Sequence, residues 1–394
     1  MSEFQYYEFL AIDRPLGAEE IAEVRKLSSR VQPTASHAAF TYAYGDFPGD
    51  ALALLAKYYD AMLYIANWGT KQLAFRFPKA AIDQAALQPY YYGVEEIELS
   101  TVGQYLILNI TFQEEGGFGW IDDSQGQLGP LAALRDDTLR GDLRALYLAW
   151  LASAARVSGL GANSSSEDLD NDEEFDDEEF DDEKRGDPTE PPVPAGLGQL
   201  TAPLRALMEF FEIDQDLVGA AAQASPPLKA TDEPLERWVQ LLPEPERNTF
   251  LARAARGEPI GAELLRRLRE VGGAARPAAS GAARRTFSTI AAVAEQVRGE
   301  RQKRERQKHE RAQLAKLEAL AKREEQVWEH IPRLLGQRTA AGYEQAVAHL
   351  AELRDLAAHR KQRAEFDLRL GRLLAPFASS AALLRRLREQ KLVK

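Results

Sequence analysis

An acidic block near the middle of the chain is the feature that most constrains how this sequence can fold. Between Glu167 and Glu183 there are 13 Asp and Glu residues and no Lys or Arg, and the run NDEEFDDEEFDDEKR (171–185) repeats with a period of five. Such a segment cannot bury enough apolar surface to offset the entropy lost on ordering, and repulsion between its carboxylates keeps it extended. Together with the flanking Gly, Ser and Pro residues, the block predicts an acidic disordered linker over 159–198.

Outside this block the chain has the composition of globular domains. The whole sequence of 394 residues has a net charge of −12, but without the block 49 Lys and Arg face 48 Asp and Glu, so the acidity is local. Its length predicts two or three domains. The absence of cysteine excludes disulfides, thiolate metal sites and a Cys nucleophile. The N-terminus lacks a signal-peptide pattern and no apolar stretch is long enough to span a bilayer, which predicts a cytoplasmic protein without membrane contact.

Residues 1–158 predict an α+β domain, with one sheet and helices packed on it. Alternating aromatic and apolar residues indicate strands over 4–12, 38–47 and 71–78, and a hairpin over 94–112. Helical spacing indicates helices over 18–31, 50–68 and 141–157.

The sequence beyond the linker has no convincing strand and predicts an all-α C-terminal half. Its expected parts are a small helical module (199–272), a second linker (273–285), a long charged helix (286–328) and a helical hairpin followed by a terminal helix (329–394). The hairpin has two predicted apolar faces, formed by Ala346, Leu350, Leu353 and Leu356 and by Phe366, Leu368, Leu370 and Leu373. A single hairpin does not make a solenoid array.

Three stretches of the chain, QYYEFLAIDRPLGAEE, ANWGTKQLAFRFPK and RAEFDLRLGRLLAPFASSAALLRRL, resemble an uncharacterised family of bacterial proteins. The resemblance covers most of the chain and implies one inherited architecture. Because that family has no assigned activity, the resemblance implies no catalytic residue and no cofactor.

The sequence offers no recognised catalytic, cofactor or metal site. It has no phosphate-binding loop, dinucleotide fingerprint or nucleophile elbow, and its five histidines lack zinc spacing. Asp13-Arg14 and Asp122-Asp123 follow predicted strands, where carboxylates commonly cap turns and can also converge as an acid–base pair. An enzyme with an unrecognised site in the N-terminal domain is therefore a third hypothesis.

Two sets of residues are candidates for an interaction surface. Tyr90, Tyr91 and Tyr92 lie in PYYYG (89–93), which resembles an exposed loop, and tyrosine offers apolar area with a hydrogen-bonding tip. The helix over 298–316 has eight Lys and Arg against three Glu, and its basic residues include Arg301, Arg304, Lys308 and Arg311.

These surfaces predict a non-enzymatic interaction or scaffold protein with a protein partner. The alternative is an accessory factor in nucleic-acid transactions, which would contact phosphate weakly through 298–316. The acidic block is then either a solvated spacer or an intramolecular screen on the basic helix. The partner's identity, the pathway and the oligomeric state stay open.

Overall fold

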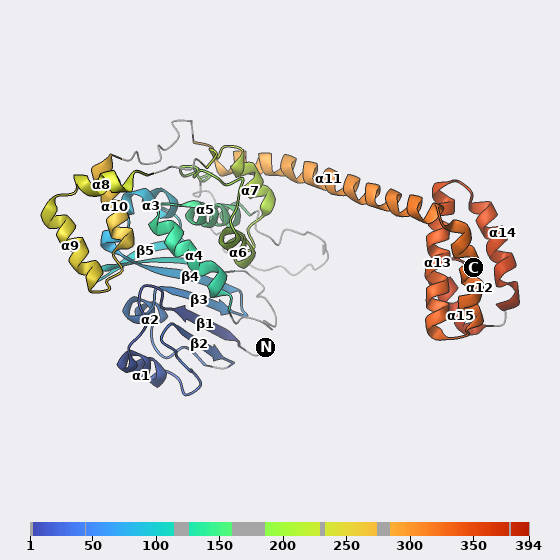
Figure 1. Ribbon diagram of the computed structural model, residues 1–394, viewed down its shortest axis with the longest axis horizontal. Coiled ribbons are helices and arrows are strands. Elements are labelled where there is room, and N and C mark those ends of the chain that lie inside the picture. The colour runs from blue at the N-terminus through green and yellow to red at the C-terminus, as the bar shows by residue number, and fades with distance from the viewer. Residues whose placement is uncertain are drawn as a thin grey trace, which may run out of the picture. The chain divides into compact units, whose positions relative to one another are not determined.

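The computed structural model (Figure 1) describes residues 3–43, 45–113, 126–159, 186–228, 233–273, 284–377 and 380–393. It divides the chain into two compact units, Met1–Arg298 and Gly299–Lys394, which we call the N-terminal unit and the C-terminal unit. The predicted N-terminal sheet with packed helices and the mostly helical C-terminal half are both confirmed.

The N-terminal unit is built on an antiparallel sheet of six strands. The strands are β1 (Gln5–Leu10), β2 (His37–Tyr42), β3 (Ala61–Ala66), β4 (Thr70–Pro78), β5 (Ile97–Val102) and β6 (Tyr105–Gln113). Their order across the sheet is β2-β1-β3-β4-β6-β5, so β2 and β5 are its two edges. The four predicted strand regions thus match β1, β2, β4 and the β5–β6 hairpin.

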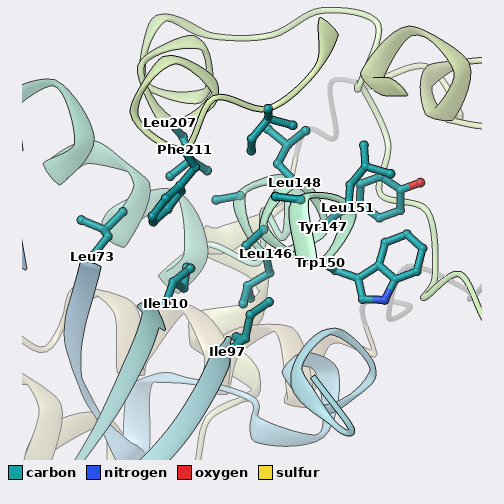
Figure 2. Close-up of a cluster of buried hydrophobic side chains, with 14 of the residues drawn as sticks. Leu73, Ile97, Ile110, Leu146, Tyr147, Leu148, Trp150, Leu151, Leu207 and Phe211 are labelled. Atoms are coloured by element: carbon teal, nitrogen blue, oxygen red, sulfur yellow. The ribbon is translucent and has the colours of Figure 1, made fainter. Parts of the chain in front are cut away.

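Both faces of the sheet are covered. The helices of this unit are α1 (Ala18–Lys26), α2 (Ala51–Tyr58), α3 (Gln84–Tyr91), α4 (Leu128–Leu139), α5 (Arg144–Val157), α6 (Ala202–Phe210) and α7 (Gln215–Ala222), followed by α8 (Leu235–Leu241), α9 (Glu244–Ala255) and α10 (Gly261–Gly272). The sequence prediction missed α3 and α4. Side chains of α1 and α2 pack on one face with Phe9 and Phe40, while α3 to α7 bury the other face around α5 (Figure 2).

The predicted helix over 50–68 is wrong in its second half. Asp50 caps α2 by accepting hydrogen bonds from the amides of Leu52 and Ala53, but the helix ends at Tyr58 and the chain continues as β3. A central strand is buried on both faces and reads as a continuous apolar run, which periodicity cannot distinguish from a buried helix. Its backbone pairing with β1 and β4 shows that this segment is a strand and not a buried helix.

The end of the predicted acidic linker is packed rather than extended. Residues 160–185 lie outside the described part of the chain. From 186 onward, however, Glu190 and Leu197 are buried, and Thr189 forms a β-bridge with Thr286. The Glu190 carboxylate accepts hydrogen bonds from the hydroxyl of Tyr147 and the guanidinium of Arg285. These contacts fasten 186–198 to the N-terminal unit.

The region predicted as a separate helical module (199–272) is divided between two hydrophobic clusters. Leu204, Leu207 and Phe211 from α6 and its end belong to the same core as the sheet. In contrast, α8 and α10 share a small cluster of their own around Trp238 and Leu268. Most of the second predicted linker, 274–283, lies outside the described residues.

The C-terminal unit buries one core among its helices. The long helix α11 (Phe287–Ala321) crosses the boundary between the units and ends seven residues before the predicted limit at 328; it is followed by α12 (Glu324–Gly336), α13 (Ala340–His359), α14 (Arg363–Leu374) and α15 (Ala381–Glu389). The turn after α11 brings Leu320 and Trp328 into the same core. The predicted apolar face of α13 is buried, but on α14 Leu368 is 67% exposed, so that part of the prediction is wrong.

Candidate functional site

The structure separates the three tyrosines that were predicted to share an exposed loop. Tyr90 and Tyr91 complete α3 and Tyr92 caps it. Tyr90 is only 3% exposed, and its hydroxyl donates a hydrogen bond to the carbonyl of Pro192 at 2.7 Å. Tyr91 is half-buried, whereas Tyr92 is 77% exposed. The predicted exposure is therefore wrong for Tyr90, which helps to hold 186–198 in place, and Tyr92 alone of the three presents a full ring to solvent.

The four candidate basic residues of α11 lie on one side of the helix. With 100° between successive residues, Arg301, Arg304, Lys308 and Arg311 fall within an arc of about 80° and span about 15 Å along the axis. We call them the basic stripe. Lys303 and Arg306 lie on the opposite side of the same helix by the same geometry. From 302 to 316 every residue of α11 is exposed, so both sides meet solvent within the described part of the chain.

The basic stripe is a mixed-charge surface with an excess of positive charge. Arg301 pairs with Glu305 at 3.3 Å and Arg304 with Glu300 at 3.3 Å, each one helical turn apart. Pairs of this kind at the surface contribute about 0.3–0.5 kcal/mol. They partly neutralise one end of the stripe and leave Lys308 and Arg311 as its more strongly positive end.

The boundary between the two units also separates charge. Gly299–Lys394 contains 22 Lys and Arg against 13 Asp and Glu, a net charge of +9, while Met1–Arg298 contains 27 against 48, a net charge of −21. The acidic block accounts for 13 of those acidic residues, so the rest of the N-terminal unit is still net negative. The near-neutral balance of the chain outside the block therefore conceals two units of opposite sign.

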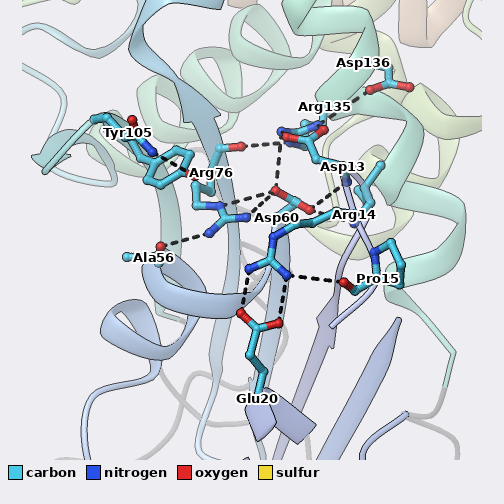
Figure 3. A network of polar contacts seen from close by, with 12 residues as sticks. Asp13, Arg14, Pro15, Glu20, Ala56, Asp60, Arg76, Tyr105, Arg135 and Asp136 are labelled. Carbon is cyan, nitrogen blue, oxygen red and sulfur yellow. Dashed lines mark hydrogen bonds and ion pairs between the residues drawn. The ribbon is translucent and has the colours of Figure 1, made fainter. Parts of the chain in front are cut away.

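Inside the N-terminal unit, ionic side chains from β4, from α4, from the segment after β1 and from the residue before β3 meet in a largely buried group (Figure 3). The Asp60 carboxylate, 1% exposed, accepts hydrogen bonds from the Arg76 guanidinium at 2.8 Å and from the amides of Ile12 and Asp13. Arg135 is fully buried on α4, pairs with both carboxylate oxygens of Asp13 at 2.9 and 2.7 Å, and donates to the carbonyl of Arg76. We call Asp13, Asp60, Arg76 and Arg135 the ionic cluster.

The electrostatics of the ionic cluster fit a structural role. Burial raises the pKa of Asp60, but the charges of Arg135 and Arg76 and the hydrogen bonds from Asp13 and Arg76 outweigh it, so that the pKa lies below its usual range. Two carboxylates face two guanidiniums, and Arg76 also lies 4.5 Å from the centre of the Tyr105 ring. Asp13, a candidate acid–base residue in the sequence, is thus committed to an ion pair. Asp122-Asp123 lies outside the described residues.

Among the described residues, no group of three or more His, Asp or Glu side chains is placed to hold a metal ion. Within the same residues, no helix has the length and apolar character needed to cross a membrane. A groove of about 430 Å³ lies between α13 and α15 in the C-terminal unit. Arg386 and Glu344, which pair at 3.1 Å, and Arg385 and Glu389, which pair at 3.6 Å, line it, so its charges are already matched.

Comparison of the chain with protein-family models, with curated proteins and with solved structures gives no match. What the protein does has to be inferred from its own residues and their geometry.

The ionic cluster was not predicted from the sequence, although two charged residues within apolar segments indicate it. Arg76 interrupts the strand pattern QLAFRFP and Asp60 interrupts the apolar run KYYDAML. A single charge inside a segment that is otherwise apolar on both faces needs a partner from elsewhere in the chain. The partner itself, Arg135, lies in a helix that the sequence reading did not identify.

Proposed function

We propose that this protein is a non-enzymatic interaction protein that binds an acidic surface of a partner protein through the basic stripe of α11. The observation that carries the proposal is the stripe itself: four cationic side chains on one exposed side of a helix. All four lie in the C-terminal unit, which has a net charge of +9. Complementary charge of this kind steers association and selects partners by sign.

A protein partner fits the stripe better than a duplex nucleic acid does. Glu300 and Glu305 lie beside the basic residues and pair with them, so the surface presents carboxylates as well as cations. A phosphate backbone repels every such carboxylate, whereas a protein surface with both signs of charge can match them.

A pair of charge-matched variants tests the proposal. The double variant Arg304→Glu/Lys308→Glu reverses two charges on the stripe, and Lys303→Glu/Arg306→Glu reverses two charges on the opposite side of the same helix. We expect proteins captured from the native cell, after nuclease treatment, to be lost with the first variant and retained with the second. Equal loss with both variants would show that net charge alone matters and would contradict a defined surface.

Nucleic acid is the second candidate partner, because the positive charge of the C-terminal unit would also attract phosphate. This function predicts retention on duplex DNA that falls steeply with salt and is abolished by nuclease. A related test concerns the acidic block, which lies outside the described residues. If the block is only a spacer, a Gly/Ser replacement of 167–183 leaves DNA binding unchanged; if it screens the stripe, binding at low salt strengthens, and reversal of Arg301, Arg304, Lys308 and Arg311 to Glu removes the gain.

A further inference from the structure

The edge strand β2 has backbone groups that point away from the sheet. In the antiparallel pair of β1 and β2, the amide of Ala11 donates to the carbonyl of Ser36, which identifies this residue pair as a hydrogen-bonded one. Such pairs alternate along the ladder, so Ala38 and Phe40 are bonded to β1. The amide and carbonyl groups of Ala39 and Thr41 therefore face outward, and no partner for them is found in the part of the chain that the structure describes.

One end of this open edge is closed by a turn. The amide of His37 donates to the Thr34 hydroxyl, and its carbonyl accepts the amide of Thr34 at 2.8 Å. The open stretch thus begins after His37 and offers two donors and two acceptors, with Ala39 and Thr41 about 6.8 Å apart. Another extended backbone supplies acceptors and donors at this repeat.

A groove of about 310 Å³ runs beside the same edge. Its lining residues are Ser28, Arg30, Val31, Ala39, Phe40, Thr41 and Ala43, so the loop after α1 forms one wall and β2 the other. Val31 and Phe40 are buried and make part of the groove apolar. Arg30 is exposed, and no carboxylate pairs with its side chain among the described residues.

We propose that this groove binds an extended, acidic segment of a partner protein, which adds to β2 as a further strand of the sheet. Backbone hydrogen bonds to Ala39 and Thr41 hold the segment in register, an apolar side chain lies against Val31 and Phe40, and a carboxylate pairs with Arg30. The site goes beyond the proposed function, because it is a different surface, in the N-terminal unit, from the basic stripe of α11.

Two substitutions in the full chain isolate these contacts. Thr41→Pro removes an amide that points outward and breaks no hydrogen bond of the sheet. An edge strand tolerates proline at such a position. Thr41→Val keeps the amide and is the control. Arg30→Glu reverses the charge at the groove, and Arg25→Glu, an exposed residue of α1 that does not line the groove, is its control.

The experiment uses a phage-displayed library of heptapeptides as the probe, followed by binding measurements on the enriched peptides. We expect enrichment of peptides with β-branched and acidic residues and no central proline. Their affinity should fall at least tenfold with Thr41→Pro, with Arg30→Glu and after N-methylation of the peptide backbone, and stay unchanged in both controls and in Arg304→Glu/Lys308→Glu. No enrichment, or enrichment that Thr41→Pro does not affect, would overturn the proposal and leave the function of the stripe untouched.

Amide hydrogen exchange gives an independent check in the free protein. The amides of Ala39 and Thr41 should exchange rapidly while those of Ala38 and Phe40 are protected, and addition of an enriched peptide should protect all four. Slow exchange of Ala39 and Thr41 in the free monomer would show that the edge is already covered and would refute the proposal. Protection that appears only with self-association would identify a second copy of the chain, and not a peptide, as the occupant.

Discussion

The two units differ in where they place their charged side chains. Every buried polar or charged side chain among the described residues belongs to the N-terminal unit, including Asp60, Arg76, Arg135 and Glu190. The buried side chains found in the described part of the C-terminal unit are hydrophobic, Tyr343 included, and its many ion pairs lie at the surface, as between Arg369 and Glu325 or Arg360 and Glu324. Specific buried ion pairs thus join parts of the sheet domain, whereas the core of the helical bundle is formed by hydrophobic side chains and its ion pairs lie at the surface.

The largest expected effect is the loss of packing in the C-terminal unit. Leu370 is 3% exposed and Leu368 is 67% exposed on the same helix, α14. Leu370→Asp removes a buried leucine and adds an unpaired carboxylate, so we expect the unit to lose about 5 kcal/mol and to unfold. Leu368→Asp should change its stability by less than about 0.5 kcal/mol. Hydrogen exchange of α13 and α14 measures both, and equal effects would mean that this face of α14 is not core.

A second effect tests the buried charges of the N-terminal unit. Asp60→Ala leaves Arg76 and Arg135 with an uncompensated buried charge, which we expect to destabilise this unit by about 3–5 kcal/mol. Arg369→Ala, which breaks a surface pair in the C-terminal unit, should cost about 1 kcal/mol or less. Chemical denaturation followed separately in each unit by hydrogen exchange compares them. If both variants cost the same, the contrast between the two units fails.

The pH dependence of stability sharpens the same comparison. Because the pKa of Asp60 is lower in the folded protein than its ordinary value, ionised Asp60 stabilises the fold above about pH 4, and this contribution is lost as the pH falls further. The hydrogen bond from Arg14 likewise lowers the pKa of Glu20 to about 2. We therefore expect the N-terminal unit to lose stability between about pH 4.5 and 2, and the loss to be smaller in Asp60→Ala.

Added salt distinguishes the effect of buried ion pairs on acid stability from the effect of surface ion pairs. The pKa of Glu325 in the C-terminal unit is also lowered, by its hydrogen bond with Arg369, but this pair is exposed and salt screens it. At high salt the acid sensitivity of the N-terminal unit should persist while that of the C-terminal unit shrinks. The same salt response in both would argue against a buried origin.

The smallest expected effect compares two buried tyrosines of the N-terminal unit. The hydroxyl of Tyr147 is bonded to Glu190, whereas the hydroxyl of Tyr59, itself fully buried, has no hydrogen-bond partner among the described residues. Tyr147→Phe should destabilise the unit by about 1–3 kcal/mol, and Tyr59→Phe should be neutral or stabilising by about 1 kcal/mol. Thermal unfolding measures both, and destabilisation by Tyr59→Phe would reveal a partner for that hydroxyl.

Local patterns in the sequence were enough to predict several strands of the sheet and the buried face of one helix. The alternation in β4 and in the β5–β6 hairpin identifies strands, and the spacing of Leu350, Leu353 and Leu356 identifies the buried face of α13. On α13 the opposite side meets water, so the period of the apolar residues reports the geometry of the helix. In β4 both faces are buried, but large apolar residues on one face alternate with Ala74 and Arg76 on the other, which keeps the period of a strand visible. The sequence also indicated basic residues along 298–316, but these lie all around the helix, and the side shared by Arg301, Arg304, Lys308 and Arg311 follows from the helix geometry of those four positions.

The sequence by itself determined where charge is concentrated and which segments can bury a face, because these depend on neighbouring residues. Only the tertiary structure decided that 61–66 is a strand, that 186–198 packs against Tyr90 and Tyr147, and that Asp60 meets Arg76 and Arg135. It also placed the boundary between the units at Arg298. The chain outside the acidic block is nearly neutral as a whole, but on the two sides of this boundary its net charge has opposite signs. These outcomes depend on pairing between residues far apart in the chain, and no local period encodes which distant group will neutralise a buried charge or complete a sheet.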